Sequence, residues 1–358
     1  MFILKSKFQI ILYIFFLVII IFFSKFSTNF AQGKNYTISN IKIIETYDLN
    51  FDKQTAIHKG FDKAFKNIIS KLLQEKDTKF FNKVNTNEIK GLIDNFSITD
   101  EKFINNQYQS TFEVEFDRNK LIKFIQSKNV SPSIPIDIQL LLVPLFINLD
   151  KNELYYFEQN IFFERWNREF KDEHLLKYNF PSEDIEDFQE LKKNLRNIED
   201  YNYDEIIKKY NFSNYIIVNF FKNKNNLKIL SKITFGSQKI LINEQIQNFN
   251  SSNYEKIDEI IYKLKKIYED SWKDINKINQ SIALPIKLKI ESKNYKLTEN
   301  FEKTLKSYEL VSQFNIEKFD NSEILYKIIF NGMPSKFIEY MKSKNLVIEN
   351  NQEIWILR

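Results

Sequence analysis

The sequence predicts an α+β protein in which tandem α/β sandwich modules follow an N-terminal export signal or membrane anchor. Residues 8–23 form an uncharged, almost wholly apolar run, and the segment 131–135 holds two prolines within four residues. Between and after these two features, some segments have apolar residues at every second position, as in strands, and others have them every three to four positions, as in helices. The predicted parts are a signal or anchor at 1–31, an α+β module at 32–130, an α/β module with an aromatic helix at 131–280, and a ferredoxin-like module at 281–358.

The apolar run sets the predicted compartment. Its sixteen residues exceed the usual core of a signal peptide, about 7–15 residues, and fall short of the about 20 that a spanning helix needs. Ala31 suits a cleavage site, but Asn29 is larger than the ideal. Cleavage after Ala31 and retention as an anchor both stay open. Lys5 and Lys7 favour a cytoplasmic N-terminus, so we expect residues from about 32 onward in the periplasm.

Charge and cysteine content exclude several classes. The formal net charge is +5, but Lys5, Lys7 and Lys25 belong to the export segment, and without them 49 basic residues face 47 acidic ones. The two signs alternate along the chain, which argues against nucleic acid, since binding it needs a concentrated positive surface. The chain has no cysteine, so disulfides, thiolate metal sites and lipid attachment at a cysteine are impossible.

The first module reads as β-α-α-β-β-α. Along its first strand the isoleucines change from one face of the strand to the other. This change indicates either two buried faces or a bulge near Ser39 and Asn40. Helical spacing marks the next two elements, and alternation marks the two strands that follow. Asp117 is suited to cap the last helix. The expected ranges are a strand at 36–44, helices at 52–74 and 86–94, strands at 102–106 and 109–116, and a helix containing Leu121.

The second module follows the proline-containing linker at 131–135. Its first strand, at 136–147, is apolar on both sides, and we expect it to end or bulge at Pro144. Pro181 and the acidic residues after it predict the start of a further helix. The other expected ranges are an aromatic helix at 153–170, a short helix at 203–210, strands at 215–221, 227–233 and 239–246, and a long helix at 254–275.

The third module reads as β-α-β-β-α-β, the order of a ferredoxin-like sandwich. Pro334 is suited to the first turn of its second helix. The expected ranges are strands at 286–290, 311–318, 324–330 and 346–357, with a helix at 299–307. Segments 123–130 and 336–346 share the letters Lys-Phe-Ile and Ser-Lys-Asn, which either duplication or biased composition explains.

The order of these elements and their residue patterns resemble those of the exported proteobacterial family labelled domain of unknown function 2066. The similarity rests on the export signal, the apolar stripe of the helix at 56–73, the strand that ends in Phe116 and Asp117, and the apolar strand at 138–145. The segment Tyr-Asn-Phe-Ser-Asn-Tyr-Ile-Ile-Val at 210–218 resembles the family's step from helix into strand. The resemblance implies export and supplies no catalytic residues.

Motifs for catalysis or cofactors are missing from the sequence. His58 and His174 are far apart and form no paired metal motif, and the five glycines make no phosphate-binding loop. Glu113, Glu115 and Asp117 share one strand face. A solvent-exposed face explains them most simply, and a general acid/base pair or a cation site is the functional alternative. The acidic patch of Glu183, Asp184, Glu186 and Asp187 is best explained by helix capping and solubility, with binding of a divalent ion or a partner as the alternative. We therefore expect no cofactor and no metal.

The aromatic helix supplies the candidate site. Arg165 and Arg168 flank Trp166, and the aromatic residues around them spread over more than one face. Exposed Trp and Arg are common anchors of binding surfaces, although core packing with two solvated arginines explains the same pattern. We expect an exported, non-enzymatic envelope protein that contacts envelope proteins or other envelope components, with membrane contact through 8–23 if that segment is uncleaved. The alternatives are a periplasmic hydrolase with an unconventional carboxylate site and a module that binds peptidoglycan or lipid.

Overall fold

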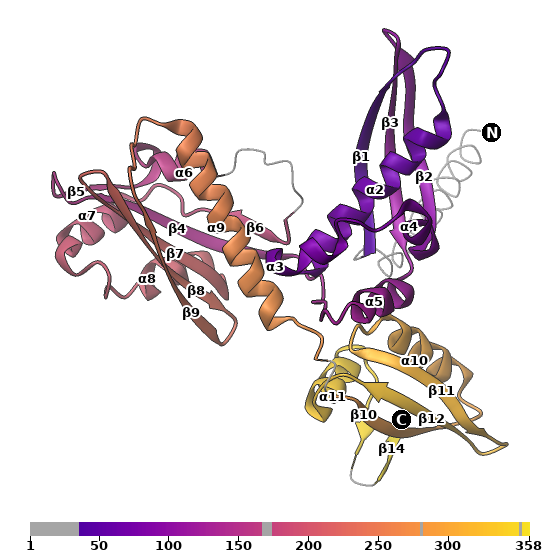
Figure 1. Cartoon of the computed structure of the whole chain (residues 1–358). Coiled ribbons are helices and arrows are strands. Elements are labelled where there is room, and N and C mark those ends of the chain that lie inside the picture. The colour runs from indigo at the N-terminus through magenta and orange to yellow at the C-terminus, as the bar shows by residue number, and fades with distance from the viewer. Residues whose placement is uncertain (1–35, 167–173, 280–281, 351–352) are drawn as a thin grey trace, which may run out of the picture.

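The computed structural model describes residues 36–166, 174–279, 282–350 and 353–358. The predicted signal or anchor, with its cleavage site at Ala31, lies outside this range. The described residues form a mixed α+β protein with three separate sheets, so the predicted fold class is confirmed. Figure 1 shows three lobes, one for each sheet. Within the described residues, no helix is both long enough and apolar enough to cross a membrane.

Module 1 is a three-stranded antiparallel sheet of order β1-β3-β2 with its helices on one face. A single core joins the covered face to the helices and includes Phe65 and Phe112. Asp52 caps the long helix by accepting from the amides of Gln54 and Thr55. The elements are β1 (Thr37–Thr46), α2 (Lys53–Leu72), α3 (Glu75–Thr78), η2 (Lys79–Phe81), α4 (Thr86–Leu92), β2 (Ile93–Ile104), β3 (Gln107–Phe116) and α5 (Arg118–Ser127).

The expected bulge in the first strand is confirmed. The β1–β3 register shifts between Ile38 and Ile41, and Asn40 adopts a φ of 59°. Both flanking isoleucines therefore point into the core although three positions separate them. The second strand begins nine residues earlier than predicted, at Ile93, because it pairs with the full length of β3. As an edge strand with a mostly exposed surface, it gives little apolar alternation to detect.

Module 2 is a six-stranded sheet covered on both faces. Cores on opposite sides of β4 pack against α6 and α9 on one face and against α7 and α8 on the other. The apolar first strand is thus buried on both faces, as predicted. The elements are β4 (Ile138–Asn148), β5 (Glu153–Tyr155), η3 (Phe157–Gln159), α6 (Ile161–Trp166), β6 (Leu176–Asn179), α7 (Ile185–Lys193), η4 (Leu195–Asn197), α8 (Asp204–Tyr210), β7 (Asn214–Asn223), β8 (Asn226–Phe235), β9 (Gln238–Ile246) and α9 (Tyr254–Ile275).

Two predictions for module 2 are wrong. The first strand neither ends nor bulges at Pro144, which stays in the parallel ladder opposite Val218. On the other side, β6 pairs only with residues 138–141 and β5 only with 146–148, so the proline lies in a gap that requires no amide donor. The aromatic segment at 153–170 is also not one helix, because β5 and η3 precede α6 and Phe157 has a φ of 51°.

Module 3 departs from the predicted ferredoxin-like order at its end. The single last strand is replaced by β13 and β14, and the sheet order is β11-β12-β10-β14-β13. β14 runs parallel to β10, whereas a ferredoxin-like fourth strand would run antiparallel to it. Pro334 does open the second helix. The elements are β10 (Leu284–Glu291), α10 (Tyr295–Ser307), β11 (Val311–Phe319), β12 (Glu323–Phe330), α11 (Pro334–Ser343), β13 (Ile348–Glu349) and β14 (Ile354–Leu357).

Modules 1 and 3 share the order of their first three strands. In both, the third strand lies between the first and the second, and a helix follows it. The sequence echo lies at the end of that helix, where Asn129 and Asn345 have φ values of 58° and 59°. The next residues, Val130 and Leu346, are both buried. The echo therefore occupies the same structural position in the two modules.

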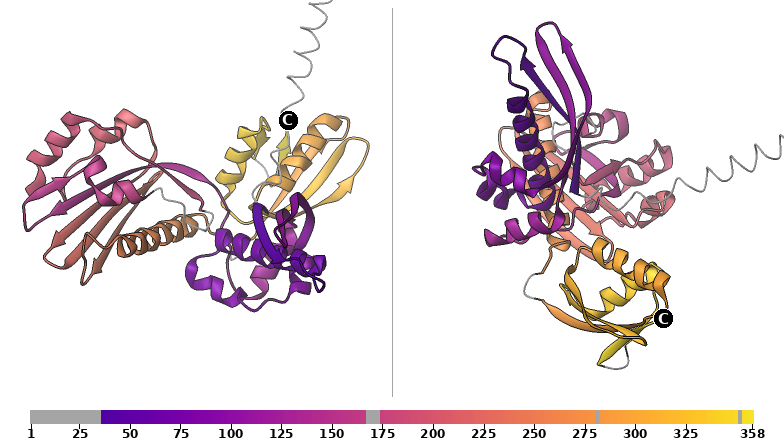
Figure 2. Two further views of the ribbon diagram at one scale, coloured as in Figure 1. Left: turned by 90° about the horizontal axis from the view of Figure 1, so that it is seen from above. Right: turned by 90° about the vertical axis from the view of Figure 1, so that its right-hand side faces the viewer.

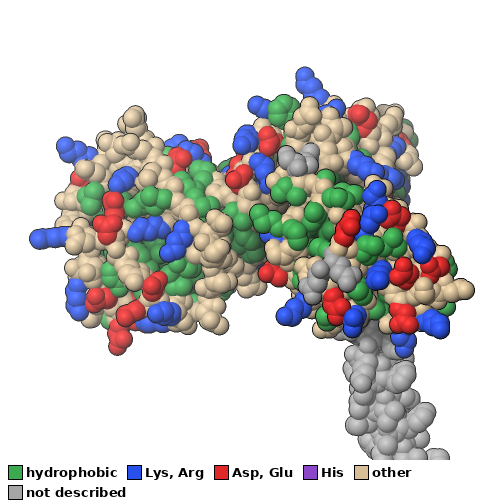
Figure 3. All heavy atoms as spheres, turned by 90° about the horizontal axis from the view of Figure 1, so that it is seen from below, with side chains coloured by type: hydrophobic (Ala, Val, Ile, Leu, Met, Phe, Trp, Pro, Cys, Tyr) green, Lys and Arg blue, Asp and Glu red, His purple; other side chains and the backbone are tan. Residues whose placement is uncertain are grey.

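The modules meet where the linker at 131–135 runs beside residues 276–278, which follow α9. Ser133 forms an isolated bridge with Lys277, and the amide of Ile134 donates to the carbonyl of Asn276. Arg118 of module 1 reaches module 3 by donating to the carbonyl of Tyr308 at 3.3 Å. Figure 2 shows the three lobes around this meeting point from two further sides. On the face in Figure 3, basic and acidic side chains are interspersed, in line with the alternation in the sequence.

Candidate functional site

The predicted binding surface on the aromatic helix is not exposed. Trp166 is fully buried, and Arg165 is 6% exposed. The guanidinium of Arg165 forms a two-point ion pair with Asp258 of α9 and stacks on the ring of Tyr254. Arg168 lies outside the described residues. The prediction that Trp166 and Arg165 form an exposed anchor is therefore wrong, because both side chains hold α6 against α9.

The carboxylate clusters have ordinary roles. Glu113 is exposed and accepts from the hydroxyl of Ser39 at 2.6 Å. Asp117 caps α5, and Asp184 caps α7. Lys209 bridges Asp184 and Asp187, at 2.7 and 2.6 Å, which neutralises much of the acidic patch. Among the described residues, no group of three or more potential ligands is placed to hold a metal ion.

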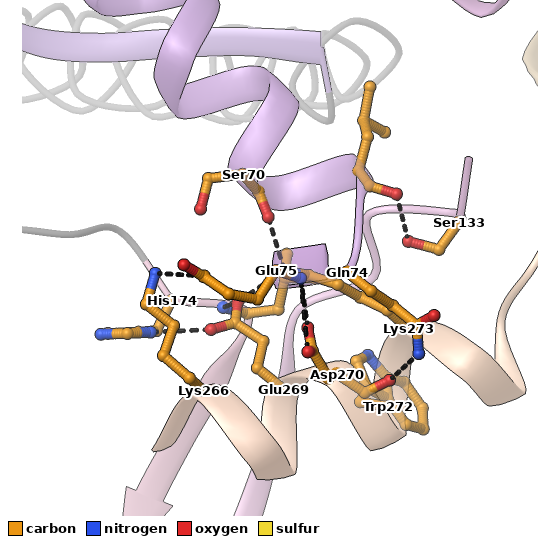
Figure 4. Close-up of polar contacts among 12 residues, drawn as sticks. Ser70, Gln74, Glu75, Ser133, His174, Lys266, Glu269, Asp270, Trp272 and Lys273 are labelled. Atoms are coloured by element: carbon orange, nitrogen blue, oxygen red, sulfur yellow. Dashed lines mark hydrogen bonds and ion pairs between the residues drawn. The ribbon is translucent and has the colours of Figure 1, made fainter. Parts of the chain in front are cut away.

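A buried polar cluster joins module 1 to module 2, and we call it the α9 joint (Figure 4). Glu269 lies at its centre. One oxygen of Glu269 is 2.8 Å from Nδ1 of His174, and the other accepts the amide of Leu175 at 3.0 Å. One turn along α9, the ammonium of Lys273 lies 3.9 Å from Glu269 and donates to the carbonyl of Ser70. A cation is favoured there, because Ser70 is in the last turn of α2, where carbonyls lack helical partners.

Further hydrogen bonds close the α9 joint around the end of α2. The Gln74 side chain donates to the carbonyl of Asp270 at 3.1 Å, and the amide of Glu75 donates to the Asp270 carboxylate at 3.0 Å. Ser133 in the linker donates to the carbonyl of Leu72 from both its amide and its hydroxyl. Four segments far apart in sequence are thereby fixed to one another.

Burial and charge compete within the joint. Burial alone would raise the pKa of Glu269, but the hydrogen bond from His174 and the charge of Lys273 outweigh it, so that pKa lies below its usual value. Burial lowers the pKa of Lys273, against the attraction of Glu269 and Asp270. Burial also lowers the pKa of Lys265, one turn before Glu269, to about 8, against the pull of Glu269. Burying these charged groups in the joint costs desolvation free energy, and the hydrogen bonds among them fix their positions.

Sequence analysis missed this joint. It considered His174 only as half of an absent metal motif and the segment 254–275 only as a long helix. A usable signal was the recurrence of Lys265, Glu269 and Lys273 every four residues, which places them along one side of the helix. In the structure all three are buried. A cavity of about 250 Å³ lies beside the joint and is lined by residues of both modules, including Ser70, Glu75 and Lys266. Lys266 and Glu75 approach each other across it at 3.6 Å.

Exposed apolar side chains gather at the end of the module 1 sheet, and we call this group the apolar tip: Ile44, Tyr47, Leu49, Phe103 and Ile104. Leu49 is exposed to 105% of its reference area, and the other four are 48–60% exposed. Two consecutive left-handed residues, Asn105 and Asn106, make the tight β2–β3 turn. The amide of Tyr47 donates to the carbonyl of Asn106 at 2.8 Å, which ties the β1–α2 loop to this turn.

An aromatic cluster supports the apolar tip from below. Phe103 packs against Tyr47, Phe51 and Tyr108, with the ring of Tyr108 fully buried in the core. The hydroxyl of Tyr108 donates to Glu101 at 2.8 Å, so its polar end is satisfied. The lysines around the tip are each paired with an acid: Lys53 with Glu101, Lys59 with Glu45, and Lys102 with Asp100. The tip loop also carries Asp48, whose carboxylate accepts the amide of Asn50 at 2.8 Å. The tip is therefore an apolar surface that the aromatic cluster supports and whose neighbouring lysines are paired.

A comparison with known protein families and with curated proteins finds no match for this sequence. The similarity to the family labelled domain of unknown function 2066 stays a prediction.

Proposed function

We propose that this chain is an exported, non-enzymatic protein of the bacterial envelope that works in the periplasm by contacting another envelope component through the apolar tip. The apolar tip is the observation that carries the proposal. Single exposed apolar residues are common on soluble proteins, but five of them at one end of a projecting sheet mark an interaction surface. The apolar run at 8–23 supports export, since it follows Lys5 and Lys7 and contains no charge.

The rest of the fold supports a contact role by holding the tip in place. The aromatic cluster around Phe103 fixes the end of the sheet, and the α9 joint fixes module 1 to module 2. Arg118 fixes module 1 to module 3. A preorganised surface binds more tightly than one that must be ordered on contact, because less conformational entropy is lost.

A periplasmic hydrolase is the second candidate, favoured by the pairing of His174 with Glu269. An ionised carboxylate only accepts, so Nδ1 of His174 carries the proton and Nε2 is the basic nitrogen. This arrangement matches the orientation of a general base by an acid. However, Nε2 is shielded from solvent and has no hydrogen-bond partner among the described residues, and the lining of the neighbouring cavity does not include His174. The contact function therefore has the stronger support.

Two measurements test the proposed function. A reporter enzyme that folds only outside the cytoplasm, fused after Arg358, should be active, and deleting residues 8–23 should abolish its activity. A photo-crosslinking amino acid at Leu49 should then form adducts with an envelope component in living cells. The matched control is Leu241, which is 61% exposed on β9 of module 2. An inactive reporter, or equal adduct yields at the two positions, would refute the proposal.

A further inference from the structure

The apolar tip has the position that contact with a flat surface requires. The sheet of module 1 projects beyond the other two lobes, and its tip is the far end in Figure 1 and in the right-hand view of Figure 2. A plane laid against the tip therefore meets neither module 2 nor module 3. A partner protein with a groove would need no such clearance, whereas a bilayer does.

The residue types of the tip fit the boundary between lipid and water. Tyr47 and Phe103 supply half-exposed aromatic rings, and Ile44, Leu49 and Ile104 supply aliphatic surface. Aromatic rings of this kind favour the headgroup level, and aliphatic side chains favour the acyl region below it. The three nearby lysines already have acidic partners at 2.6–2.8 Å, so the tip offers no excess positive charge for anionic headgroups.

The chain length between the apolar run and the sheet allows the tip to reach the membrane. β1 starts at the base of the sheet, where Thr37 pairs with Glu115, and runs to the tip, where Thr46 pairs with Gln107. Its 10 residues cover about 33 Å. Residues 24–36 separate the apolar run from β1, and these thirteen residues span at most about 43 Å. An anchored chain can thus extend from the bilayer to the base of the sheet and return to the bilayer along β1.

We infer that the apolar tip rests in the surface of the bilayer that holds residues 8–23, as a second membrane contact made by apolar side chains. This inference rests on the proposed function, because it names the envelope component that the tip touches. A tether and a tip together fix the orientation of the molecule on the membrane. The anchor raises the effective concentration of the tip at the bilayer, because it makes binding of the tip intramolecular.

The absence of cysteine makes a direct test possible, because any introduced cysteine is unique. The full chain, reconstituted in vesicles of phosphatidylcholine and phosphatidylglycerol, carries an environment-sensitive fluorophore at Leu49→Cys or at the control Leu241→Cys. Nitroxide lipids should quench the probe at 49 several-fold more than the probe at 241. The difference should persist at high salt and without phosphatidylglycerol, because the tip lysines are already paired. Equal quenching at the two positions would overturn the inference.

Two variants sharpen this test. Deleting residues 27–33 leaves a spacer of six residues, about 20 Å, which is too short for the tip to return to the bilayer. Quenching at 49 should then disappear although the anchor is intact, and its persistence would contradict the geometry. With the probe at Ile104→Cys, Leu49→Asp should lower the fraction of tips in the bilayer about tenfold, whereas Leu241→Asp should leave it unchanged. Equal effects of the two Asp variants would contradict the inference.

The failure of this inference can be told apart from the failure of the proposed function. If the probe at 49 is not quenched but the crosslinker at 49 captures a single protein in cells, the bilayer is the wrong occupant and the contact function stands. If the probe is not quenched and the crosslinker gives no more adduct than at 241, both proposals fall.

Discussion

Replacing Glu269 by Met should destabilise the protein far more than replacing Lys273 by Met, although the two residues form one buried pair. Glu269 accepts from His174 and from the amide of Leu175, and it lies 3.9 Å from the Lys273 ammonium. Without Glu269, two buried donors lose their acceptor, at a cost of about 1–3 kcal/mol each. The buried ammonium of Lys273 also loses its carboxylate partner. We expect a total loss of about 3–5 kcal/mol.

Replacing Lys273 by Met should cost only about 1–2 kcal/mol. The variant loses the hydrogen bond to the carbonyl of Ser70, but Glu269 keeps its other two donors. It also removes an ammonium whose burial already lowers its pKa. The double variant should be no less stable than Glu269→Met alone, because it leaves no unpaired charge.

Urea unfolding followed by tryptophan fluorescence measures these differences, and Trp272 in α9 is close to the joint. Lys263→Met is the matched control, since Lys263 is a 54% exposed lysine on the same helix that pairs with Glu244. It should change the free energy of unfolding by no more than about 0.5 kcal/mol. Equal losses for Glu269→Met and Lys273→Met, or additive losses in the double variant, would refute the explanation of the joint.

Two further predictions concern α9 and the glycines of module 1. The folded-state pKa of Lys265 is about 8 and its unfolded value 10.5, so between these pH values the folded protein releases a proton that the unfolded chain keeps. Wild-type stability should rise there by at most about 3 kcal/mol relative to Lys265→Met, and parallel pH profiles of the two proteins would contradict this. Gly91→Ala in α4 meets no atom within 4 Å and should stabilise by up to about 1 kcal/mol, whereas a Cβ at Gly60 in α2 lies 3.2 Å from the ring of Phe112. Gly60→Ala should therefore lose about 1 kcal/mol in thermal or urea unfolding, and an equal gain at both sites would show that this ring gives way.

Local signals made α9 and most of module 1 predictable. The α9 helix has the predicted bounds, 254–275, because Asn253 caps it and its apolar residues keep helical spacing. The bulge at Asn40 was also readable, since the isoleucines change sides there. In these elements, neighbouring residues carry the information that decides the structure.

Pairing between distant segments was not predictable in the same way. The aromatic residues near Trp166 spread over several faces because they serve two cores: Phe162 and Trp166 pack on one side of the sheet, and Phe157 packs on the other. The sequence showed the spread over several faces but not its division between two cores, so one helix was expected. The last strand was likewise misjudged, because the place of β14 beside β10 depends on residues more than 60 positions apart.

The apolar tip also depends on such pairing. Ile44 lies near the end of β1, and Tyr47 and Leu49 follow that strand, whereas Phe103 and Ile104 are the last residues of β2. They meet because β3 pairs with both outer strands to their ends, with Thr46 opposite Gln107 and Gln107 opposite Ile104. Read along the sequence, they are scattered apolar residues in a chain that is rich in them.

The ratio of photo-crosslinking yields at Leu49 and Leu241 in living cells tests the central claim most directly. Both leucines are more than half exposed, and they lie in different modules, so each is accessible to a partner that contacts its own module. We predict that position 49 gives most of the adduct, with a lipid as the captured species. Equal or negligible yields at both positions would contradict the claim that this protein works through its apolar tip.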